Sequence, residues 1–143
     1  MSEAAKQMGN DYGGRLAPGA TFGPYLITRP IGSGGMAQVY EAVHGGLKKR
    51  VALKILNADL SASEATRKRF LYEGQAASRI RHQNVVDITD VGEDDGIAFL
   101  VMEYLEGETL EQLLERRGAL PGKQAVDLMI PIIAAIAAAH EAD

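Results

Sequence analysis

The stretch IGSGGMAQVYEAV, residues 31–43, decides how the rest of the chain is interpreted. Gly32, Gly34 and Gly35 are followed by valine, tyrosine and alanine, a mixture that favours a strand over a helix. The glycines are therefore predicted at the tip of a hairpin between the extended runs 25–31 and 38–44. Glycine backbone amides in such a loop can cover phosphate groups, and the alternative is a mobile turn without a ligand.

The composition is that of a globular domain. The chain has 143 residues, of which 46% are hydrophobic and 24% charged. Its net charge of −4 argues against a nucleic-acid partner, and the absence of cysteine excludes disulfides and thiolate metal sites. No signal-peptide pattern is found, so we expect a cytoplasmic protein. The longest uncharged run, 128–139, is too short for a membrane span, and none is expected.

The remaining pattern predicts an α+β fold with five strands. Residues 1–22 have no periodicity and are expected to be a flexible lead-in. Strands are predicted at 50–56, 85–91 and 97–104, in addition to the two of the hairpin. A helix should run from about 62 to 81 behind a capping box of Ser61 and Glu64. A second capping box, Thr109 with Gln112, starts a short helix, and a last helix follows Pro121.

Two charged residues stand out within apolar patterns. Lys54 shares a strand face with the small residue Ala52, where a flat ring could lie; the alternative is a surface lysine on an edge strand. Glu73 lies on the helical stripe of Phe70 and Ala77, and a buried carboxylate requires a cation. Lys54 is the expected partner, and the alternative is a surface pair with Arg69 or Lys68.

These motifs, in this order and spacing, resemble the eukaryotic-like protein kinase family, and especially its bacterial serine/threonine kinases. IGSGGMAQVY resembles the family's glycine-rich loop and VALK its third-strand motif. The run from Arg69 to Leu114 is similar to the family's helix C, next two strands, hinge and helix D. The resemblance implies a kinase small lobe at 23–104 and, at 105–143, the hinge with helices D and E of an incomplete large lobe.

The resemblance also implies an ATP site. Lys54 would hold the α- and β-phosphates, Glu73 would orient Lys54, and backbone groups of Glu103 and Leu105 would bond adenine. The glycine loop would cover the phosphates with Gly32, Ser33, Gly34, Gly35, Met36 and Ala37. Four apolar residues would wall the base, with Met102 in the gatekeeper position: Ile31, Val39, Ala52 and Met102. The family's third glycine is Ala37 here, which is expected to weaken or alter phosphate contact without abolishing it.

The family's catalytic half has no counterpart in the 143 residues. The catalytic aspartate, the Mg²⁺-binding asparagine and aspartate, and the activation segment would all follow Asp143. We therefore expect Mg²⁺ only where those ligands are supplied, no metal site within this chain, and no kinase activity from this chain alone. The stripe of the last helix, from Val126 to His140, would be uncovered and available for association with another protein; the alternative is that it folds back on the sheet.

Three functions compete at this point. The first is the ATP-binding portion of a protein serine/threonine kinase. The second is a non-catalytic module, similar to a pseudokinase, that binds nucleotide or docks on another protein. The third is a dinucleotide-dependent oxidoreductase, which would need a helix directly after Ala37 to receive the pyrophosphate.

Overall fold

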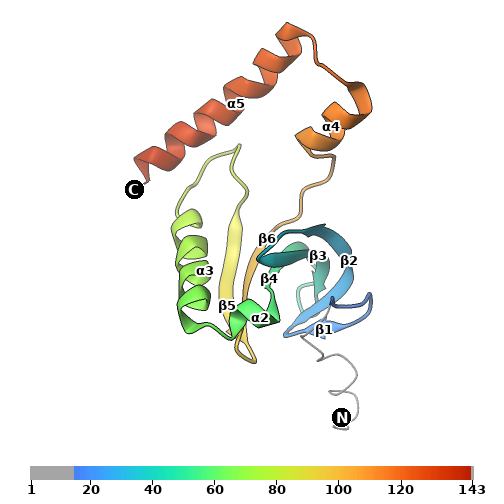
Figure 1. Ribbon diagram of the computed structural model, residues 1–143, viewed down its shortest axis with the longest axis vertical. Helices are drawn as coiled ribbons and strands as arrows, with labels where there is room; N and C mark the ends of the chain where they lie inside the picture. Colours follow the sequence, from blue (N-terminus) through green and yellow to red (C-terminus); the bar gives the residue numbers. More distant parts are fainter. Residues whose placement is uncertain (1–14, 143) are drawn as a thin grey trace.

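The computed structural model describes residues 15–142, which form a six-stranded antiparallel sheet with helices at one side and beyond one end (Figure 1). The strand order is β1-β2-β3-β4-β6-β5. The strands are β1 (Thr21–Phe22), β2 (Tyr25–Ser33), β3 (Ala37–His44), β4 (Arg50–Leu56), β5 (Ile88–Asp94) and β6 (Ile97–Glu103). The predicted α+β fold and antiparallel sheet are confirmed, with one strand more than predicted because β1 is too short to show a period.

The start of the packed chain is a correction to the sequence prediction. Leu16 is buried and its N–H donates to the Tyr40 hydroxyl at 3.0 Å, and Phe22 is fully buried with its ring edge-on to Phe99. The predicted flexible lead-in is therefore wrong for residues 15–22, whereas residues 1–14 lie outside the described residues. A short segment without periodicity can still insert single large side chains into a core built by strands far along the sequence.

The two faces of the sheet bury different clusters. One face carries the larger apolar core, formed by Leu16, Phe22, Tyr25, Ile27, Tyr40, Ala42, Val51, Leu53, Ile55, Ile97, Phe99 and Val101. The other face packs against helix α3 (Glu64–Ala77) through Ala37, Leu56, Phe70, Ala98 and Leu100. The methyl group of Ala37 lies in this second cluster, which is a packing role for the alanine that replaces a glycine in the loop motif.

The predicted helix from 62 to 81 corresponds to α3, which is shorter than predicted and ends at Ala77. A short helix α2 (Ala58–Ser61) precedes α3, and the N-cap of α3 is Ser63, whose hydroxyl accepts from the Thr66 N–H at 3.3 Å. Ser61 is buried and its hydroxyl donates instead to the Leu56 carbonyl at 3.4 Å. By sequence, either serine could be the N-cap of this helix. Because Ser61 is buried and bonded elsewhere, Ser63 takes that position.

The C-terminal helices lie beyond one end of the sheet (Figure 1). Helix α4 (Leu110–Arg117) begins with the predicted capping box of Thr109 and Gln112, and α5 (Gly122–Glu141) follows. No residue of α5 is buried, so it does not fold back on the sheet. Its exposed large apolar side chains include Val126, Met129, Ile130, Ile133 and Ile136. By length and composition alone, α5 is also the one described helix that could cross a membrane.

Candidate functional site

The glycine loop joins β2 to β3 as a hairpin. Gly32 pairs with Val39 and Ser33 with Gln38, and the Gly34 N–H donates to the Ala37 carbonyl at 2.9 Å. Gly34, Gly35 and Met36 form an exposed tip. Because a strand and not a helix follows Ala37, the loop offers no helix N-terminus to a pyrophosphate. The dinucleotide-binding alternative therefore has no structural support.

Asn57 holds this loop through two hydrogen bonds, a role that the sequence did not predict. Its backbone N–H donates to the Met36 carbonyl at 2.9 Å, and its side-chain amide donates to the Gly35 carbonyl at 3.3 Å. Asn57 directly follows β4, which carries Lys54 two positions before its end. Nothing in the local pattern around Asn57 indicates a contact 22 residues away, because that contact depends on the pairing of β3 with β4.

Four of the predicted site residues share one face of the sheet. Val39 is directly opposite Lys54 in the β3–β4 ladder, and Ala52 is directly opposite Met102 in the β4–β6 ladder. Ala52 and Lys54 are two residues apart on one strand and so point the same way. The structure thus places the Lys54 ammonium beside an apolar surface. Val39, which is opposite Lys54, also pairs with Gly32 of the glycine hairpin.

The other predicted residues border this face. Ile31 is the extra residue of a β-bulge between the Pro30 and Gly32 pairs, and it is 38% exposed. Glu103 ends β6, and its N–H donates to the Asp87 carbonyl at 3.0 Å. Leu105 is exposed and, within residues 15–142, forms no backbone hydrogen bond, so its N–H and C=O are open to a ligand.

The predicted ion pair between Lys54 and Glu73 is absent from the described residues. Lys54 is half-buried, with its ammonium nitrogen 5.9 Å from the centre of the Phe70 ring. Glu73 is exposed and accepts a hydrogen bond from Arg69 Nε at 2.8 Å, which raises the pKa of Arg69. The sequence alternative, a surface pair one helical turn apart, is the one observed, because it leaves the carboxylate hydrated.

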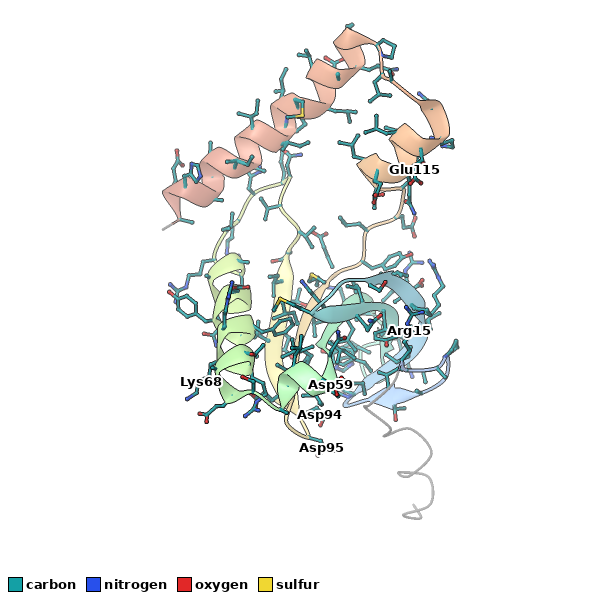
Figure 2. All side chains as sticks on the ribbon, in the orientation of Figure 1. Arg15, Asp59, Lys68, Asp94, Asp95 and Glu115 are labelled. Atoms are coloured by element: carbon teal, nitrogen blue, oxygen red, sulfur yellow. The ribbon has the colours of Figure 1, made fainter. Side chains whose placement is uncertain are left out.

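The residue of α3 that faces the sheet between Phe70 and Ala77 is Gly74. A Cβ atom at this position would lie 2.3 Å from Cδ2 of Leu100, the residue opposite Lys54 in the sheet. Gly74 therefore sets how closely α3 approaches the strand beside Lys54. The outer side of α3 is the charged one, and Figure 2 shows Lys68 pointing away from the sheet. The signal missed was a glycine inside a helix. Such a glycine costs about 1 kcal/mol relative to alanine, so its presence indicates a close approach to a neighbouring element.

No predicted site residue lines the cleft between α4 and α5. This cleft of about 310 Å³ is lined by Leu113, Arg117, Leu120, Gln124, Asp127 and Leu128. Its lining has neither a glycine loop nor an aromatic side chain. Among residues 15–142, no three His, Asp or Glu side chains gather as a metal site would require.

Comparison with known proteins gives a consistent family. Residues 25–143 match a family model described as protein kinase domain. The chain is 45% identical over 119 residues to the serine/threonine-protein kinase PrkC of Bacillus subtilis, covering 83% of this chain and 18% of that protein. It is 41% identical over 122 residues to the serine/threonine-protein kinase PknH of Mycobacterium tuberculosis, covering 85% and 20%.

Solved structures agree with these matches. The crystal structure of the Mycobacterium tuberculosis PknI kinase domain, C20A mutant, aligns with a TM-score of 0.78 and 31% identity, covering 90% of this chain and 53% of that chain. The chain thus spans about a fifth of the length of the curated relatives and about half of that kinase domain.

Proposed function

Because this chain belongs to the protein kinase domain family, we propose that it is the ATP-binding portion of a protein serine/threonine kinase. The observation that supports this most directly is the shared face of Val39, Ala52, Lys54 and Met102 in front of the glycine hairpin. Such a face combines an apolar surface for a planar base with one cation for the phosphates.

Each part of the site then has a role in holding ATP. Lys54 would bind the α- and β-phosphates, and the backbone amides from Gly32 to Ala37 would cover them. Open backbone groups at Leu105 would bond the adenine edge, together with Glu103. For Glu73 to orient Lys54, it would have to leave Arg69 and turn toward the sheet.

Phosphoryl transfer itself is not assigned to this chain. Transfer requires groups that orient the acceptor hydroxyl and neutralise charge on the phosphates through Mg²⁺. The described residues contain no cluster that fits a Mg²⁺ ion, and the family's catalytic loop motifs do not occur in the sequence. We therefore propose that this chain by itself binds ATP without transferring its phosphate.

A titration with a fluorescent ATP analogue tests the proposal. Lys54→Met keeps the length of the side chain and removes its charge, and Lys68→Met makes the same change on the outer face of α3. A charged hydrogen bond to phosphate contributes about 1.5–3 kcal/mol, so Lys54→Met should weaken binding by roughly 10- to 150-fold. Lys68→Met should bind as the wild type does. Equal affinities for both variants, or no binding by the wild type, would refute the proposal.

A docking module is a second candidate, favoured by the exposed α5. Seven large apolar side chains of α5 are exposed by 37% or more, and an apolar surface of this kind commonly marks an association site. Sedimentation velocity tests this candidate, because a clean monomer that binds no apolar dye would leave it without support.

A further inference from the structure

Glu41 is a buried carboxylate on the same face of the sheet as the proposed ATP site. Its side chain is 9% exposed, and it accepts from Arg29 Nε at 2.8 Å, with Arg50 Nη1 at 3.7 Å. Glu41 is directly opposite Ala52 and two residues beyond Val39 on β3. A carboxylate in this position costs several kcal/mol unless cations compensate for the lost hydration, and two arginines do so here.

The same two arginines also hold the segment that follows β6. Arg29 Nη2 donates to the Tyr104 hydroxyl at 3.0 Å, and the Arg50 guanidinium carbon lies 4.3 Å from the centre of the Tyr104 ring. Arg50 also forms a hydrogen-bonded ion pair with Glu106, which raises the pKa of Arg50. Both arginines therefore join the buried Glu41 to residues 104–106. We call these five residues the hinge clamp: Arg29, Glu41, Arg50, Tyr104 and Glu106.

Residues 104–109 depend on such contacts for their position. They lie between the end of β6 at Glu103 and the start of α4 at Leu110, and they have no regular secondary structure. Gly107 has a φ of 129°, so the backbone there adopts a conformation that favours glycine. Since no backbone hydrogen bond of the described residues holds Leu105, the side chains on either side of it determine its placement.

We propose that the hinge clamp is a positioning site for the nucleotide, in which Glu41 orients Arg29 and Arg50 so that they fix Tyr104 and Glu106 and thereby place the open backbone of Leu105. This inference rests on the proposed ATP-binding function. None of the clamp side chains is assigned a contact with ATP itself, although Tyr104 is bonded to Glu103 and Leu105 and Glu41 is directly opposite Ala52. The clamp residues act through the backbone between Glu103 and Leu105. Along β4, Arg50 lies on the side of Ala52 that is away from Lys54.

The clamp differs from an ordinary set of surface ion pairs. Exposed pairs contribute little because water competes for both partners. Here the anchor is buried, one arginine stacks on an aromatic ring, and the two arginines share their donors between the sheet and the segment. Loss of Glu41 should therefore release the segment as a unit, where the loss of a single exposed pair would not.

The test compares three variants of the full chain in two measurements. Glu41→Gln removes the buried charge with little change of shape, Glu106→Gln removes the exposed end of the clamp, and Glu111→Gln is a matched control in α4. The first measurement, without nucleotide, is the NMR order parameter of the backbone amides of residues 104–107. The second is the affinity for the fluorescent ATP analogue.

With Glu41→Gln we expect the order parameters to fall from about 0.85 to below about 0.6, with those of the β3–β4 ladder unchanged. If the segment is then correctly placed about one tenth of the time, ATP binding weakens about tenfold. Glu106→Gln should show the same effects in smaller size, and it keeps the test decisive if Glu41→Gln does not fold. Glu111→Gln should match the wild type.

The outcomes separate the two proposals. If both clamp variants match Glu111→Gln in order parameters and affinity, the hinge clamp is refuted while ATP binding by the wild type stands. If the wild type binds no ATP analogue, the proposed function and the clamp's role in nucleotide positioning both fail. Order parameters that fall without any change in affinity would likewise overturn the positioning role.

Discussion

Gly74→Ala should destabilise this protein, although the same change at an open helical site would stabilise it. The added Cβ would lie 2.3 Å from Leu100 Cδ2 and 3.4 Å from both Leu100 Cδ1 and Cγ. Carbon atoms in contact are about 3.5 Å apart or more, so the first distance is short by about 1.2 Å. Leu100 is 7% exposed and surrounded by the Phe70 cluster, which restricts its escape to another rotamer.

Two opposing terms determine the size of the effect. Replacing glycine by alanine inside a helix contributes about 1 kcal/mol of stability. Overpacking of a core costs about 1–3 kcal/mol. Taking about 2 kcal/mol for the second term, we expect a net loss of about 1 kcal/mol in the free energy of unfolding. For a chain of this size, that loss lowers Tm by roughly 3–5 °C.

Urea unfolding followed by circular dichroism measures this difference. Gly122→Ala is the control, because it lies in α5 where a Cβ would meet nothing within 4 Å, and it should be neutral or stabilising. In a Leu100→Ala background the space is vacated, so Gly74→Ala should become stabilising by about 1 kcal/mol. A Gly74→Ala variant that is more stable than the wild type would refute the close approach of α3 to β6.

Three further results are expected. Phe22→Ala should cost about 3–5 kcal/mol in unfolding free energy, because the ring is fully buried against Phe99; a loss below about 0.5 kcal/mol would contradict the packing of residues 15–22. The hydrogen bond from Arg116 holds the pKa of Glu108 below its ordinary value. The stability that this pair contributes is therefore present well above that ordinary pKa and is lost as pH falls through the lowered pKa. The wild type and Glu108→Gln should accordingly differ in unfolding free energy more near about pH 6 than near about pH 3. Ile130→Lys should reduce apolar-dye binding and self-association while changing unfolding free energy by less than about 0.5 kcal/mol, and unchanged dye binding would show that α5 does not carry the apolar surface.

Much of the architecture was predictable because it depends on local backbone geometry. The alternation in 50–56 predicted β4, and the glycines before β-branched and aromatic residues predicted the β2–β3 hairpin. Thr109 and Gln112 are three residues apart, which is the distance over which a capping box forms, and that cap is present. Lys54 was predicted to share a strand face with Ala52, and it does so because strand side chains alternate with a period of two.

The sequence by itself determined five of the six strands, the hairpin and the face that carries Lys54, because each follows from a period or a spacing within a few residues. Only the tertiary structure decided which partner each charged group meets. Glu73 can reach Arg69 from its own helix, whereas Lys54 lies on another element, and the distance between the elements depends on how Gly74 meets Leu100. The partners of Glu41 are likewise set by tertiary structure. Arg29 and Arg50 approach it only after β2, β3 and β4 have paired, and only then is its burial compensated.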